Sequence, residues 1–206
     1  TIPGWGSPRA MEAPAVTALF YHNRCFGGPF NFPYYYETYH EFAVAHSQGI
    51  AGVTAPRFDL LLKLLVSPFR GLIYYSPILL LAPLGIAAML KDREWRKEGA
   101  AILLASIGYL LFNSAFSDWE GGWSMGPRHL VPLIPFLMTA IMYLAAKASV
   151  AGRRIFALAA APLGTISIVF MGLGVSVFPY FPKEFSNPLY DLSLRFLLRG
   201  RFAPNA

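Results

Sequence analysis

Four apolar runs constrain this chain more than any other feature of its sequence. They cover residues 71–90, 99–116, 130–146 and 155–178, and none of them contains Asp, Glu, Lys or Arg. About 20 apolar residues, each adding about 1.5 Å of helix, cross the roughly 30 Å hydrocarbon core of a bilayer. The sequence therefore predicts four transmembrane helices, of which 130–146 is slightly short and 155–178 is long enough to tilt.

The overall composition supports a membrane protein. Charged residues make up 14% of the chain, hydrophobic residues 55%, and the mean hydropathy is +0.46. Soluble domains contain about 25% charged residues. The pI near 9.5 does not indicate nucleic-acid binding, because the basic residues lie in short links between apolar runs and form no stripe.

The sequence offers no ligand set for a metal. Cys25 is the single cysteine, which excludes an intrachain disulfide and a cysteine metal cluster. His22, His40 and His46 are scattered, without the paired spacing of a zinc site. We therefore expect no metal and no cofactor.

The links between the runs predict the orientation of the chain in the membrane. The link 91–98 holds four basic residues and 147–154 holds three, whereas 117–129 holds only Arg128. Basic links favour the cytoplasmic side, which places 117–129 outside. Counting spans then places the long polar segments 21–70 and 179–206 outside as well.

Two of these outer segments share a pattern. Pro56–Leu65 and Pro188–Leu197 both read Pro, any, aromatic, Asp, Leu, any, Leu, basic, any, Leu. Chance similarity between two leucine-rich helices is an equal alternative. In either case each segment is too short and too charged to span, and its acid-then-base order suits a helix. The predicted fold is an all-α, polytopic bundle of transmembrane helices with short interfacial helices on the outer face.

The same reading predicts four regions. Residues 13–21 are apolar but too short to span, so we expect 1–20 to be the tail of a truncated transmembrane helix. Residues 21–70 form an outer segment with an interfacial helix, 71–178 the four transmembrane helices, and 179–206 an outer C-terminal segment. The chain is then the C-terminal part of a longer protein, and its partners are the bilayer and the missing N-terminal helices.

The link 117–129 carries the residue types that a membrane enzyme needs at the lipid boundary. Trp119 and Trp123 lie four residues apart and suit either an aromatic belt or a platform for sugar rings. Asp118 and Glu120 can act as a base, bind a substrate hydroxyl or pair with a cation. We expect a structural salt bridge with Arg128 as the simplest of these roles.

Three basic side chains are candidates for a phosphate group. Arg128 can bind a phosphate through two parallel hydrogen bonds or contact lipid headgroups. His129 either shares that phosphate or makes a hydrogen bond at the start of the next helix. Arg70, which lies just before the first apolar run, is a further possible phosphate contact.

The segment 21–40 is rich in aromatic residues between Gly and Pro turns. It is interpreted either as a loop beside a substrate groove or as part of an aromatic belt at the membrane surface.

Three motifs occur here in order: Tyr-His-Asn-Arg-Cys-Phe-Gly-Gly-Pro-Phe at 21–30, Ser-Pro-Phe-Arg-Gly-Leu-Ile-Tyr-Tyr-Ser-Pro at 67–77, and Asp-Trp-Glu-Gly-Gly-Trp-Ser-Met-Gly-Pro-Arg-His-Leu-Val-Pro at 118–132. The chain resembles, over residues 21 to 145, the C-terminal half of bacterial multispanning proteins related to the GT-C glycosyltransferases, which include protein mannosyltransferases. The resemblance implies sugar transfer from a polyprenyl-phosphate-linked donor at the outer face of the bacterial cytoplasmic membrane.

The resemblance assigns no catalytic residue. In that superfamily the principal catalytic carboxylate lies in the first outer loop, which this chain does not contain, and His129 stands where Tyr is more usual. Two other functions compete with the transferase: a non-catalytic membrane scaffold and a transporter of lipid-linked or small polar solutes. A transporter coupled to ions needs ionisable groups inside its spans, and the four runs supply none.

Overall fold

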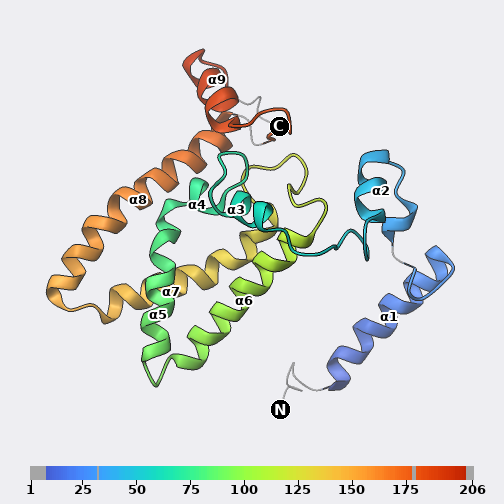
Figure 1. Cartoon of the computed structure of the whole chain (residues 1–206), viewed down its shortest axis with the longest axis horizontal. Coiled ribbons are helices and arrows are strands. Elements are labelled where there is room, and N and C mark those ends of the chain that lie inside the picture. The colour runs from blue at the N-terminus through green and yellow to red at the C-terminus, as the bar shows by residue number, and fades with distance from the viewer. Residues whose placement is uncertain (1–7, 32, 178–179, 203–206) are drawn as a thin grey trace. The chain divides into compact units, whose positions relative to one another are not determined.

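The computed structural model describes residues 8–31, 33–177 and 180–202 (Figure 1). Within these residues the regular structure is entirely helical, and no strand is present. The predicted all-α class is therefore confirmed. The chain divides into two compact units, Thr1–Thr54 and Ala55–Ala206, which are described separately.

The described part of the N-terminal unit contains the 19-residue helix α1 (Pro8–Phe26) and two shorter elements, η1 (Pro33–Tyr36) and α2 (His40–Ser47). Helix α1 continues through residue 21, where the sequence analysis placed the start of an outer segment. Glu37 directly follows η1, and its Oε2 lies 2.8 Å from Nδ1 of His46 in α2, which links the two elements. The boundary between the units lies inside the region predicted as one outer segment, 21–70, and residues 1–7 lie outside the described part.

The C-terminal unit contains the apolar helices. Its elements are α3 (Phe58–Val66), α4 (Leu72–Tyr75), η2 (Pro77–Leu81), α5 (Ala82–Lys91), α6 (Arg96–Ala115), η3 (Arg128–Leu133), α7 (Ile134–Lys147), α8 (Val150–Val177), η4 (Leu189–Leu194) and α9 (Arg195–Leu198).

Three helices in the described part of the chain are long and apolar enough to cross a membrane: Arg96–Ala115, Arg128–Lys147 and Val150–Val177. They cover three of the four predicted spans, except for Phe116, which follows the end of α6, and residue 178, which is not described. The second begins as the 3₁₀ turn η3 because Pro132 lacks the N–H that an α-helix needs.

The remaining apolar run, 71–90, is not the continuous helix that the sequence analysis expected. Helix α4 ends at Tyr75, Ser76 leaves the helical region (φ −135°, ψ 70°), and the chain resumes as η2 and α5. A residue before proline is driven out of the α-helical region, and Pro77 has no N–H to donate. The unbroken part, Pro77–Lys91, is shorter than the helices long enough to span.

Helix α5 lies at the centre of the packing. At Gly85, α5 approaches α7 so closely that a Cβ would collide with the carbonyl oxygen of Ala140. Met89 of α5 is fully buried, and Gly99 of α6 packs against it. Figure 1 shows α7 crossing α5, with α6 joined to the lower end of α5 by a short link and α8 leaving the far end of α7 at an angle.

The two basic links lie together at one end of this unit. Tyr143, near the end of α7, donates a hydrogen bond of 2.6 Å to Asp92 in the α5–α6 link. Lys147 lies 3.2 Å from the same carboxylate. The first cause of the low pKa of Asp92, about 2, is the hydrogen bond from Tyr143. The links predicted to share one side of the membrane are therefore neighbours.

The two segments predicted as interfacial helices are both helical. Helix α3 buries Leu60 and Leu64, and Asp59 lies 3.9 Å from Lys63 one turn later. The second segment is a π-helical turn, η4, that continues into α9 and carries the equivalent pair of Asp191 and Arg195 at 3.8 Å. The shared acid-then-base pattern thus produces the same i, i+4 ion pair in both.

Helix α3 also exposes an apolar stripe. Phe58, Leu62 and Val66 are exposed at a spacing of four residues, on the side away from the buried leucines. A helix that is apolar on its outward face suits the boundary between headgroups and hydrocarbon.

Candidate functional site

The loop 117–127 lies at the opposite end of the unit from the basic links, where it is held by Arg70. The Arg70 side chain is 0% exposed. Its guanidinium donates hydrogen bonds to the carbonyl oxygens of Glu120 (3.1 Å), Gly122 (3.0 Å), Phe181 (2.9 Å) and Phe69 (3.2 Å). One side chain therefore ties the α3–α4 junction to the loop and to the segment after α8.

The burial of this charge is compensated by its surroundings. Burial lowers the pKa of Arg70, but four carbonyl dipoles and the ring of Phe69, 4.0 Å from the guanidinium carbon, replace the lost water. The phosphate contact expected of Arg70 stays a prediction. In this arrangement Arg70 positions the loop.

The two carboxylates of the loop share a partner that the sequence analysis did not identify. Lys183 Nζ lies 3.0 Å from Glu120 Oε2 and 3.8 Å from Asp118 Oδ1. The expected salt bridge with Arg128 is wrong, because Lys183 reaches the acids from the segment after α8. No local spacing signals this partner, since Lys183 is more than 60 residues from the loop in the sequence.

Arg128 stands apart from this network. Its side chain is exposed, and within the described residues it has no ion pair or side-chain hydrogen bond. Its backbone N–H donates to the carbonyl of Gly126 at 3.1 Å, which closes the turn before η3. The guanidinium is therefore available to an anion at the loop end of the unit.

His129 follows directly and is packed rather than exposed. Its ring meets Phe116 edge-on, with centroids 5.8 Å apart, and its buried Nε2 has no hydrogen-bond partner among the described residues. Gly121, at φ +69°, lies against this ring, and a Cβ there would come within 3.1 Å of Nε2. Glycine at 121 thus provides both the turn and the close approach.

The two tryptophans of the loop have different surroundings. Trp119 is half-buried, with its ring 6.3 Å from that of Phe69 and with Lys63 Nζ 5.9 Å from its centroid. Trp123 is 61% exposed. Trp119 therefore helps to pack the loop, whereas Trp123 is free to contact a sugar ring or a headgroup.

Comparisons of the chain with protein-family models, with curated proteins and with solved structures find no match. The resemblance to GT-C glycosyltransferases therefore stays a prediction.

The described residues contain no group of three or more His, Cys, Asp or Glu that could hold a metal ion. What the loop brings together is an exposed arginine, an adjacent imidazole with an unsatisfied Nε2, an exposed indole and two carboxylates paired with one lysine. An exposed arginine favours phosphate and other oxyanions, because its guanidinium can make two parallel hydrogen bonds.

Proposed function

We propose that this chain is the membrane portion of a glycosyltransferase that uses a polyprenyl-phosphate-linked sugar donor at the outer face of the membrane. The observation that carries the proposal is the state of Arg128. It is an exposed cation at the start of a candidate span, and no described residue forms an ion pair with it. Arg70 and Lys183, by contrast, are already occupied in internal contacts.

The site suggests a division of roles. Arg128 binds the phosphate that links the donor's lipid to its sugar, and it stabilises the charge that the phosphate gains as the sugar leaves. The exposed face of Trp123 contacts the sugar, whereas Nε2 of His129 is buried against Gly121 and does not reach the oxyanion in this arrangement. The base that takes the proton from the acceptor hydroxyl is not assigned.

Sugar transfer by the whole protein tests the proposal. With a polyprenyl-phosphate sugar donor in proteoliposomes, Arg128→Ala should lower transfer by roughly 10- to 100-fold, since hydrogen bonds to a charged group contribute about 1.5–3 kcal/mol. Arg128→Lys should recover only part of it, because an ammonium cannot make two parallel bonds. Arg154→Ala, an exposed arginine of α8 near the basic links, is the matched control and should leave transfer unchanged. Equal transfer by all four proteins would refute the proposed role of Arg128.

A non-catalytic scaffold is the second candidate, and one observation favours it. Arg70 is occupied by four backbone carbonyls, and the carboxylates of Asp118 and Glu120 pair with Lys183, which is what a loop built only for rigidity needs. A scaffold predicts that no variant of Arg128, His129 or Trp123 changes any transfer reaction while the protein still inserts and folds.

A further inference from the structure

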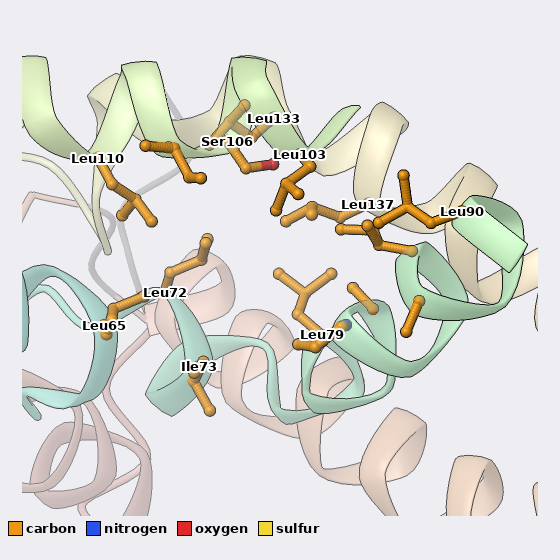
Figure 2. Close-up of a pocket in the computed structure, with 15 residues that line it drawn as sticks. Leu65, Leu72, Ile73, Leu79, Leu90, Leu103, Ser106, Leu110, Leu133 and Leu137 are labelled. Carbon is orange, nitrogen blue, oxygen red and sulfur yellow. The ribbon is translucent and has the colours of Figure 1, made fainter. Parts of the chain in front are cut away.

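Two apolar grooves of the C-terminal unit differ in the side chains that accompany them. One lies between α5, α6 and α7 (Figure 2), and the polar side chain that lines it, Ser106, donates its hydroxyl to the carbonyl of Ile102 at 2.7 Å. The other, of about 460 Å³, lies between the last turns of α8 and the C-terminal element η4–α9, which carries exposed arginines. The second groove therefore combines apolar contacts with charge.

The element η4–α9 is anchored to the unit by one side only. Leu189 and Leu192 are buried in a cluster with Phe181 of the segment after α8. Beyond them, Leu197 is 37% and Leu198 77% exposed. Exposed apolar side chains on an element that is already held in place mark a surface for contact with a membrane or a partner.

Three arginines accompany this apolar surface, and the fold fixes where they lie. Arg195 and Arg199 are one helical turn apart, so they share a side of α9. Helix α9 then ends in a turn in which Gly200 adopts φ +64° and the N–H of Arg201 donates to the carbonyl of Phe196 at 2.9 Å. This bond holds the backbone of Arg201 against the last turn of the helix, next to the other two arginines.

The positive charge of this turn is only partly balanced within the chain. Arg195 lies 3.8 Å from Asp191, whereas no described residue forms an ion pair with Arg199 or Arg201. All three arginines are exposed. One acid against three arginines leaves a local net charge of +2. Guanidinium groups in this state favour phosphate, to which they can make two parallel hydrogen bonds.

The groove places these arginines at the end of a candidate span. Gly172 and Ser176 of α8 line it together with Leu194 of η4 and with Phe202. Helix α8 is long and apolar enough to cross a membrane, and it ends at Val177. Arginines just beyond the end of such a helix meet the lipid headgroups, while the groove beside the helix lies along the apolar layer.

We propose that η4–α9 and the end of α8 bind an anionic phospholipid, with its headgroup at Arg199 and Arg201 and an acyl chain in the groove. The sequence predicts an interfacial helix here, and the inference adds a lipid site with a charge preference. Phosphatidylcholine carries a phosphate too, but its choline cancels the charge. A surface of net charge +2 should therefore prefer phosphatidylglycerol. The inference does not depend on sugar transfer.

Local quenching of a fluorophore measures this preference in the whole protein. In a Cys25→Ser background, Leu198→Cys carries the fluorophore. Phosphatidylcholine nanodiscs contain a spin-labelled quencher lipid, either phosphatidylglycerol or phosphatidylcholine, at the same mole fraction. Each arginine near an anionic surface favours binding by about fivefold, so phosphatidylglycerol should be preferred at position 198 by about fivefold to 25-fold. Ile168→Cys, 74% exposed on α8, is the reference position and should show equal quenching by both lipids.

Charge variants test whether the two arginines cause the preference. Arg199→Gln with Arg201→Gln should bring the ratio at position 198 to about one, and Arg199→Lys with Arg201→Lys should keep most of the preference, because the charge is retained. Arg93→Gln with Arg154→Gln is the matched control. It removes two exposed arginines elsewhere in the unit and should leave the ratio unchanged.

Four results would overturn the inference. They are equal quenching by the two lipids at position 198, a preference that survives the double glutamine variant, quenching by neither lipid, and loss of the preference in glycerol 3-phosphate at constant ionic strength. The third would show that this surface contacts something other than lipid, and the fourth that it takes a soluble phosphate. None of the four bears on Arg128-dependent transfer, so this inference and the proposed function fail separately.

Discussion

Replacing Arg70 with methionine should detach the loop 117–127 from its supports. Methionine keeps much of the apolar stem of arginine but donates no hydrogen bond. The carbonyls of Glu120, Gly122 and Phe181 would then lose the donor that joins three separate segments. An unsatisfied buried polar group costs about 1–3 kcal/mol. Because two of the three hydrogen bonds are only partly buried, we take the lower value, about 1 kcal/mol, for each carbonyl that loses its donor. The expected loss in the free energy of unfolding is therefore about 3 kcal/mol.

Denaturant unfolding of the purified protein in mixed micelles measures this loss, with Arg57→Met as the control. Arg57 pairs with Asp59 at 2.9 Å, but both side chains are more than half exposed, so its removal should destabilise the protein far less than the removal of Arg70. Hydrogen exchange supplies a second readout. The amides of the loop should exchange faster in Arg70→Met than in the wild type, and at the wild-type rate in Arg57→Met. If Arg70→Met were as stable as Arg57→Met and its loop equally protected, the reasoning about the buried guanidinium would be refuted.

Two further predictions concern the helix packing and the basic links. Gly85→Ala should destabilise the protein by about 1–3 kcal/mol in the same unfolding assay, because its Cβ would meet the Ala140 carbonyl, whereas Gly108→Ala, which meets nothing within 4 Å, should not. Asp92→Asn should lower the melting temperature at pH 7. The pKa of Asp92 falls from 3.8 to about 2 on folding. The ionised carboxylate therefore stabilises the folded state above about pH 4, and this stabilisation is lost as the pH drops towards 2. The melting temperatures of wild type and Asp92→Asn should converge over that range, and a constant difference would contradict the assignment.

The long helices were predictable because a single physical requirement governs them. Runs without charge that are long enough to cross hydrocarbon must satisfy their own backbone, and a helix does this within one segment. The same reasoning failed at Ser76. Pro77 and Pro83 are visible in the sequence, but whether neighbouring helices tolerate a proline or the helix breaks depends on packing that the sequence does not display.

The candidate site was predictable in its residue types and not in its pairings. The position of Arg128 beside His129 follows from the sequence. That no described residue forms an ion pair with Arg128 depends on the tertiary fold. Lys183 reaches Asp118 and Glu120 only because the segment after α8 returns to the loop. The burial of Arg70 likewise requires carbonyls from the loop and from the segment after α8, and no sequence pattern marks such a meeting.

Labelling of introduced cysteines in intact cells tests the central claim most directly, namely that the loop 117–127 and the basic links lie on opposite sides of the membrane with the loop outside. In a Cys25→Ser background, which removes the exposed native thiol, Ser124→Cys reports on the loop and Glu94→Cys on the α5–α6 link. A membrane-impermeant maleimide should modify position 124 in intact cells and position 94 only after the membrane is opened. Modification of position 94 alone in intact cells would invert the orientation and contradict an outward-facing site.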